Sequence, residues 1–143
     1  MILKVKKLDE RAIIPEYATK GSVAFDVCAL EDALIISGMP VVLIRTGLAF
    51  SIPEGYEIQV RQRSGLSLKH ANYLANCIGT IDSDYRGELK IPISLYGRDR
   101  WKIKKGDRIA QCLLKKAEIP KLVEVEELDE TERGSGGFGH TGK

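Results

Sequence analysis

The residues best suited to chemistry gather in the segment 76–88. It holds an amide, two aspartates, a phenol and a guanidinium around two glycines: Asn76, Asp82, Asp84, Tyr85 and Arg86. We expect a β-hairpin with an exposed tip. Its backbone could hydrogen-bond a planar base while an aspartate acts as general base for water. Because Asp and Gly are common in turns anyway, the residue types alone favour an ordinary solvated turn.

Two further segments could serve an anionic ligand. Arg63, Ser64 and Gly65 follow an alternating strand and precede a predicted helix, so a cation, a hydroxyl and amide groups could converge on phosphate. An ordinary helix cap explains the same residues and is the commoner case. The segment 106–111 places a turn before a strand that carries Gln111, which is either a cleft residue or a polar surface residue.

The C-terminal residues 133–143 hold five of the 14 glycines and follow an acidic stretch, so they form a glycine-rich arm without a core of its own. The arm does not match a P-loop, because no Lys-Ser/Thr pair follows the glycines. It could close over an anionic ligand, with Arg133 and Thr141 on phosphate and Phe138 on a ring. A flexible linker is an equally good interpretation.

Several other chemistries lack support in the sequence. His70 and His140 have no second ligand at zinc spacing, the three cysteines form no CxxC pair, and no Gly-x-Ser-x-Gly motif is present. A net charge of +2 with scattered cations argues against nucleic-acid binding. No apolar run approaches the roughly 20 residues of a membrane span, and charge interrupts the N-terminus early, so we expect a cytoplasmic protein without a membrane partner.

The elements that must position these residues are mostly short strands. Alternation of polar and apolar residues is clearest at 57–61 and 89–95, where Pro92 indicates an edge strand or a bulge. Shorter strands are predicted at 3–7, 24–29, 33–36, 41–45, 47–51, 108–115 and 121–125. Regular turn signals between them indicate an all-β sandwich or jelly-roll barrel, with one short helix after Ser64. With 143 residues, we expect one domain, a β core at 1–132 and the arm at 133–143.

Taken in order, five segments resemble the five motifs of the trimeric dUTPases, which hydrolyse dUTP to dUMP and pyrophosphate. They are 21–27 (GSVAFDV), 63–66 (RSGL), 79–87 (GTIDSDYRG), 106–111 (GDRIAQ) and 133–139 (RGSGGFG). Each motif alone would be weak evidence, but five in sequence over residues 21–142 are specific. The resemblance implies a jelly-roll-like subunit, a homotrimer, and active sites built from all three chains.

The resemblance also implies residue roles. The base would bind on main-chain groups around Gly79, Thr80 and Ile81 and on the Asn76 side chain, which accepts uracil and rejects cytosine. Tyr85 would lie under the deoxyribose and exclude UTP. Asp82 would be the general base for the water that attacks the α-phosphorus, and Lys90 would add a backbone contact.

Phosphate contacts are implied for Arg63, Ser64, Gly65 and Gln111, with Ser64 near the bridging oxygen of the leaving pyrophosphate. From a neighbouring subunit, Phe138 would cover the base while Arg133, Gly139 and Thr141 clasp the distal phosphates. Mg²⁺ would be held by the substrate phosphates and water, with Asp26 as a possible indirect contact. Such an enzyme limits uracil incorporation into DNA and supplies dUMP for thymidylate synthesis.

The chain departs from the family pattern in places. Gln62 replaces a usual proline, Ser67 a common alanine or glycine, and Phe25 a frequent tyrosine. His140 replaces a small hydroxyl residue, and this change puts one γ-phosphate contact in doubt. A dCTP deaminase, a dUTP sensor without hydrolysis and a structural trimer are the alternatives. Asp82 and the glycine-rich arm argue against them.

Overall fold

The computed structural model describes residues 1–97 and 100–140, which form one short helix among eleven strands. The first six strands are β1 (Lys4–Lys7), β2 (Phe25–Cys28), β3 (Ala33–Ile36), β4 (Val42–Arg45), β5 (Leu48–Ser51) and β6 (Tyr56–Arg61). After them come α1 (Ser64–His70), β7 (Asn72–Leu74), β8 (Gly79–Ile81), β9 (Lys90–Leu95), β10 (Arg100–Ile103) and β11 (Arg108–Lys116).

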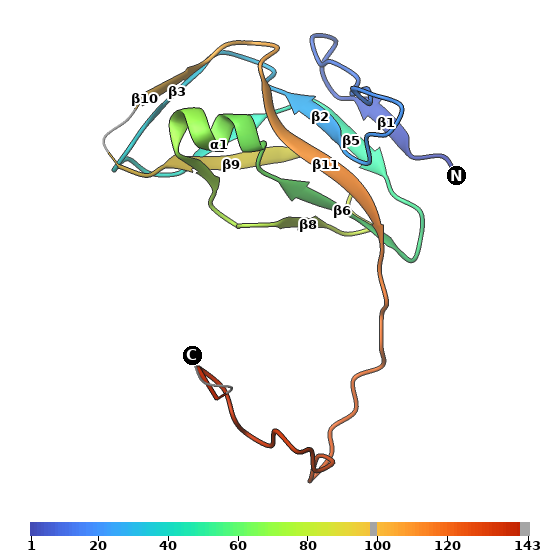
Figure 1. Cartoon of the computed structure of the whole chain (residues 1–143). Helices are drawn as coiled ribbons and strands as arrows, with labels where there is room; N and C mark the ends of the chain where they lie inside the picture. Colours follow the sequence, from blue (N-terminus) through green and yellow to red (C-terminus); the bar gives the residue numbers. More distant parts are fainter. Residues whose placement is uncertain (98–99, 141–143) are drawn as a thin grey trace.

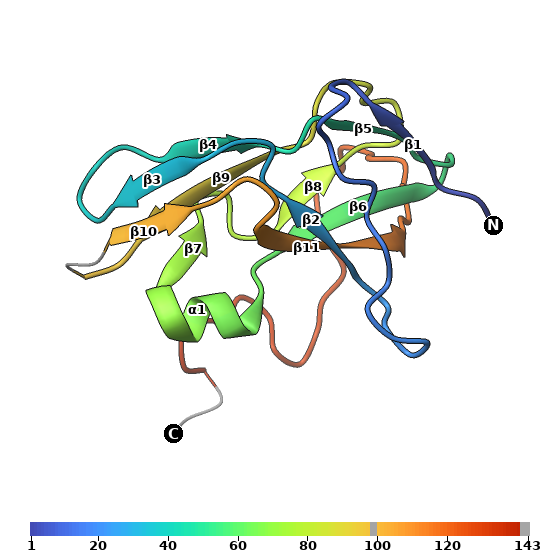
Figure 2. The ribbon, with the colours of Figure 1, turned by 90° about the horizontal axis from the view of Figure 1, so that it is seen from above.

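The strands pair antiparallel in two larger and two smaller sheets (Figures 1 and 2). The larger sheets have the orders β2-β11-β6-β8 and β4-β9-β7, and the smaller ones pair β1 with β5 and β3 with β10. Inward side chains of both larger sheets share one hydrophobic core, including Val27, Ile58, Ile91 and Ile109, each at most 1% exposed. The sequence prediction of a mainly β fold with one short helix is confirmed.

The helix differs from its prediction by one residue. Ser64 is the first helical residue rather than the cap, and Arg63 precedes it in an extended conformation without a side-chain capping bond. The helix ends where Ala71 adopts a left-handed conformation with φ of 47°, and its N–H donates to Ser67 O. Arg63 therefore stands at the junction between β6 and α1.

Pro92 lies in β9, which pairs with both β4 and β7, so the prediction of an edge strand or bulge is wrong. The proline is accommodated because the β7 ladder ends beside it. The last ladder pair is Leu74 with Ile93, and Ala75 N then donates to Pro92 O at 2.9 Å. The nitrogen of Pro92 thus faces the end of β7, where the lack of an N–H interrupts no ladder.

The predicted strand at 121–125 is also wrong, because these residues carry no strand pairing and are all exposed. Figure 1 shows the chain leaving β11 and running away from the sheets as an extended arm. Three short strands, β7, β8 and β10, were not predicted from the sequence. Among the described residues, no helix has the length and apolar character needed to cross a membrane.

The prediction of a simple β-hairpin at 76–88 is wrong. The strand in this segment, β8, pairs with β6, whereas the residues before and after it lead to β7 and β9 of the other large sheet. The segment is therefore a crossover between sheets. It turns at Cys77, where φ is 58°, and again at Asp82, whose carbonyl accepts from Tyr85 N at 3.2 Å.

Candidate active site

A carboxylate between two guanidinium groups organises one end of the β2-β11-β6-β8 sheet. Asp26 of β2 accepts from Arg63 Nε through Oδ1 and from Arg108 Nη1 through Oδ2, each at 3.0 Å. Arg63 Nη1 also donates to Arg108 O at 3.1 Å. Both oxygens of Asp26 are thus in use, and the two arginines are held side by side.

These residues line a pocket of about 260 Å³ that we call the phosphate pocket. Its lining joins the first, second and fourth sequence motifs: Ala18, Ser22, Ala24, Asp26, Arg63, Ser64, Gly65, Arg108 and Gln111. The lining has two cations, two hydroxyl groups and one carboxylate that is already paired, so the pocket suits an oligophosphate.

A β-bulge explains why Arg108 and Gln111 share this pocket. Residues three apart in a regular strand point to opposite faces. The register of β11 against β2 shifts between Arg108 and Ala110, which adds one residue to β11 and brings both side chains to the same side.

The loop that carries Arg63 is fixed by polar contacts. Gln111 Nε2 donates to Gln62 O at 2.7 Å, and Ser67 Oγ lies 3.3 Å from Gln62 Oε1 and 3.2 Å from Arg63 O. The two departures from the family pattern, Gln62 and Ser67, are therefore in contact with each other. Their hydrogen bond restrains the backbone at a position where the family pattern has a proline.

The crossover segment offers a different kind of site. β8 is the edge strand of its sheet, so alternate N–H and C=O groups of Gly79, Thr80 and Ile81 point away from β6. The Asn76 amide lies against Gly79, where an added Cβ would be 3.0 Å from Nδ2. Open main-chain groups beside a side-chain amide can hydrogen-bond the edge of a planar base.

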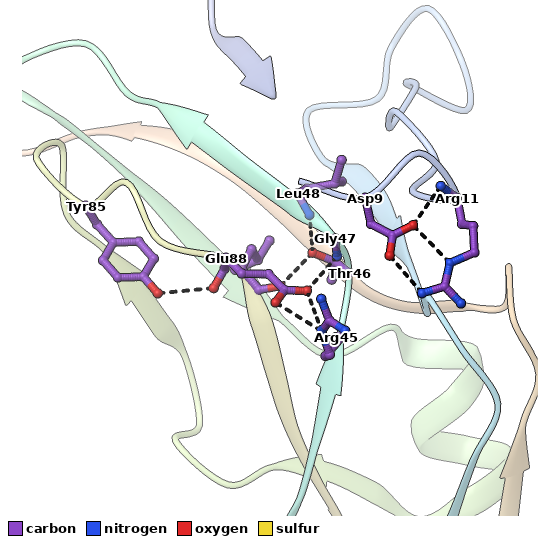
Figure 3. A network of polar contacts seen from close by, with 9 residues as sticks. Asp9, Arg11, Arg45, Thr46, Gly47, Leu48, Tyr85 and Glu88 are labelled. Atoms are coloured by element: carbon purple, nitrogen blue, oxygen red, sulfur yellow. Dashed lines mark hydrogen bonds and ion pairs between the residues drawn. The ribbon is translucent and has the colours of Figure 1, made fainter. Parts of the chain in front are cut away.

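Tyr85 is held over this segment by a network around Glu88 (Figure 3). The phenol donates to Glu88 O at 3.1 Å, and its ring packs where a side chain on Gly87 would have to be. The Glu88 carboxylate accepts from Arg45 Nε at 3.1 Å and from Gly47 N at 2.9 Å. Lys90 begins β9 opposite Arg45, is exposed, and does not line the phosphate pocket.

Asp82 lies far from the phosphate pocket within this chain. It is exposed and lines a second cleft of about 670 Å³, together with Tyr56, Glu57, Asp84 and Ala117 among others. Ile81, the residue before Asp82, pairs with Ile58, which lies about 10 Å along the strand from Arg61 at the end of β6. Arg63 follows beyond that end. The fold therefore separates the predicted base from the predicted phosphate contacts.

The arm residues also lie apart from the phosphate pocket. Arg133 Nε donates to Gly136 O at 2.7 Å, and the Phe138 side chain is fully exposed. Gly139 has a φ of 97°, and no described residue of the arm lines the phosphate pocket. Thr141, also predicted as a phosphate contact, lies outside the described residues.

Sequence reasoning missed two residues of this site. Arg108 was part of the fourth motif but received no role, because only the bulge brings it beside Gln111. Glu88 was taken as part of a turn, and its contact with Arg45 joins residues 43 positions apart. No local pattern in the sequence signals either contact.

Comparisons with known proteins agree with this geometry. The dUTPase family model matches residues 10–142. The deoxyuridine 5'-triphosphate nucleotidohydrolase of Nautilia profundicola is 50% identical over 143 residues and all of both chains. That of Finegoldia magna is 53% identical over 130 residues, 90% of this chain and 91% of its own.

Solved structures give the same result. The dUTPase of Staphylococcus bacteriophage 80alpha with dUpNHpp has a TM-score of 0.87 at 30% identity and covers 99% of both chains. A mutant dUTPase of S. aureus phage phi11, described with a structural Mg(II) ion, has a TM-score of 0.80 at 28% identity and covers 89% of this chain and 98% of its own. With its motifs, its pockets and these relatives in agreement, the chain belongs to the dUTPase family.

Proposed function

We propose that this protein hydrolyses dUTP to dUMP and pyrophosphate in active sites that its subunits share. The observation that carries the proposal is the division of the motif residues between two places. Base-binding groups and Asp82 lie on the crossover segment, and cations for a triphosphate line a separate pocket. A relative that is named for this activity and is 50% identical over the whole chain supports the same reaction here.

Base selection would follow from the open edge of β8 and from Asn76. A fixed set of main-chain donors and acceptors matches uracil, whereas the exocyclic amine of cytosine would meet a donor. The tight crossover would leave no room for the methyl group of thymine. Tyr85, held by Glu88 and Gly87, would lie against the sugar and clash with a 2′-hydroxyl.

Asp82 would take a proton from water as the water oxygen attacks the α-phosphorus. The bond from the α-phosphorus to the bridging oxygen then breaks, and pyrophosphate leaves. Arg63, Ser64, Gly65 and Gln111 would hold the phosphates, and Arg108 adds a second guanidinium in the same pocket. These cations stabilise the charge that develops on the leaving group.

The substrate would carry Mg²⁺, which neutralises triphosphate charge when bound. The phosphate pocket fits an ion held mainly by phosphates and water, because its carboxylate, Asp26, already accepts from two arginines. Asp26 could still hydrogen-bond to the water shell of the ion. A solved relative described with a structural Mg(II) ion supports a metal in this family.

A homotrimer would reunite the separated groups. Asp82 follows the strand residue that pairs with Ile58, whereas Arg63 follows the other end of β6, so one dUTP is better served by Asp82 of one chain and the pocket of another. The segment between β11 and the arm supports assembly as well, because five large apolar side chains in it are exposed: Ile119, Leu122, Val123, Val125 and Leu128. Burial of such side chains by a neighbouring subunit would stabilise the assembly. Arg133, Phe138, Gly139 and Thr141 would then close over a neighbour's substrate.

Pyrophosphate release from dUTP, dCTP, dTTP and UTP with Mg²⁺ tests the function. We expect hydrolysis of dUTP alone. Asp82→Asn should lower kcat by about 100-fold or more, because the carboxamide cannot accept the proton. The cytoplasmic location predicted from the sequence stays a prediction.

Asp84→Asn is the matched control, since Asp84 is exposed in the same turn and has no assigned role. It should keep most of the activity. Comparable turnover of UTP would contradict the role of Tyr85, and full activity of Asp82→Asn would contradict the role of Asp82.

A further inference from the structure

A second basic cleft adjoins the phosphate pocket. It has a volume of about 380 Å³, and its lining comes mainly from α1, β10 and the start of β11. Figure 2 shows where these elements lie. Arg63 and Arg108 line both hollows, so the two lie next to each other. One wall is rigid, because the His70 ring stacks on Trp101 with centroids 4.9 Å apart and planes at 10°. Trp101 itself is 4% exposed.

The cleft has an excess of positive charge. Arg63, Lys69, Lys102 and Arg108 line it with Asp107 as the one carboxylate. Arg63 and Arg108 are paired with Asp26. Lys69 and Lys102 are exposed, and neither has an ion-pair partner in the part of the chain that the structure describes. Two unpaired ammonium groups therefore remain for an anionic partner.

The segment directly before the arm carries a matching negative charge. Residues 124–132 contain six carboxylates and no cation: Glu124, Glu126, Glu127, Asp129, Glu130 and Glu132. All of them are exposed, and none forms an ion pair with a described residue of its own subunit. Unpaired acidic residues thus lead directly into the glycine-rich arm.

We propose that the acidic segment 124–132 of one subunit docks in the basic cleft of a neighbour. This rests on the proposed function, which places Arg133 and the glycines on the neighbour's phosphate pocket. Residues 129–132 directly precede Arg133 and extend over at most about 14 Å, which keeps them beside that pocket. The basic cleft lies next to that pocket, and its Lys69 and Lys102 can pair with the acidic residues. The docked acidic segment would fix the direction in which the arm approaches the substrate.

Zero-length carbodiimide cross-linking of the full-length protein tests the contact directly. An equal mixture of ¹⁴N and ¹⁵N chains, assembled together, separates contacts between chains from contacts within a chain. We expect peptides that join Lys69 or Lys102 to residues 126–132, half of them with mixed labels by random assembly. Absence of these peptides, or their occurrence within single chains only, would overturn the proposal. The result does not depend on hydrolysis, so dUTP turnover of the same sample reports separately on the proposed function.

A double-mutant cycle tests the energetic coupling. Lys69→Gln/Lys102→Gln removes the cleft charges, and Asp129→Asn/Glu130→Gln removes charges of the acidic segment. Protection of the Arg133 bond from trypsin is titrated with dUpNHpp. Each change should raise the half-protecting concentration about three- to tenfold, because exposed ion pairs are individually weak. The combined variant should be no worse than either one.

Lys4→Gln/Lys6→Gln, two exposed lysines on β1, is the matched control and should leave protection unchanged. Additive effects of the cleft and acidic-segment changes, or equal effects of the β1 control, would contradict docking and indicate a general charge effect. If dUpNHpp protection is weaker in the cleft variant but unchanged in the Asp129→Asn/Glu130→Gln variant, the cleft would be a site for free phosphate groups instead.

Discussion

The three cysteines illustrate how the fold sets the reactivity of single residues. Burial raises the pKa of the Cys28 thiol, with Asp26 nearby adding to the effect. Burial raises the pKa of Cys112 to about 12. Cys77 is exposed in the turn beside Asn76. A raised pKa leaves less thiolate at a given pH, so the first two thiols should be poor nucleophiles.

Alkylation with iodoacetamide at pH 8, followed by mass spectrometry, should therefore label Cys77 first, Cys28 slowly and Cys112 last. In urea all three should react alike, which is the internal control. Rapid labelling of Cys112 in the folded protein would show that the core opens more easily than its burial implies.

Single residues were predictable where a motif names them and less so where the fold creates the contact. Asp82, Arg63 and Gln111 follow from the resemblance to a family, and Asp26 with its neighbours lies in the predicted first motif. The pairing of Arg108 with Asp26 needs the bulge in β11, which shifts side chains by one position. The alternation of polar and apolar residues does not reveal a bulge, because it is read on the assumption of a regular strand.

At the level of elements, the turn between β4 and β5 supports Tyr85 through Glu88. Gly47 in this turn has a φ of 70°, and its N–H donates to Glu88. An added Cβ would come within 2.9 Å of Ala12 Cβ and 3.1 Å of Leu30 Cδ1. Both the backbone conformation and the packing therefore require glycine here.

Gly47→Ala should lower the free energy of unfolding by about 2 kcal/mol or more, measured in urea at a fixed protomer concentration. Gly55→Ala is a suitable control, since its φ is 77° but an added Cβ would meet nothing within 4 Å. The control should cost about 1 kcal/mol from backbone strain alone. Equal losses in both variants would mean that the packing around Gly47 relaxes.

Strand prediction failed where the partner lies outside the local pattern. Residues 121–125 have the composition of a strand, yet a strand also needs a neighbour, and the isolated subunit offers none. Pro92 was expected at an edge because proline breaks ladders. The sequence does not reveal that β7 ends beside it.

For the whole molecule, we expect the arm to serve activity without stabilising its own subunit. All described residues of 133–140 except Gly136 are exposed, so their removal exposes little apolar surface. Deletion of residues 133–143 should leave the thermal unfolding midpoint nearly unchanged and cripple dUTP turnover. A fall of the midpoint by many degrees would show that the arm is part of the folded core.

The proposed sharing of one active site between chains is tested most directly by mixed trimers. Asp82→Asn and Arg63→Ala chains, each nearly inactive alone, are produced separately and co-refolded in equal amounts. If each site takes Asp82 and Arg63 from different chains, about one quarter of the sites in random trimers are intact, and about a quarter of the wild-type activity returns. Mixed trimers no more active than their parents would place both residues in the same chain's site and contradict the account.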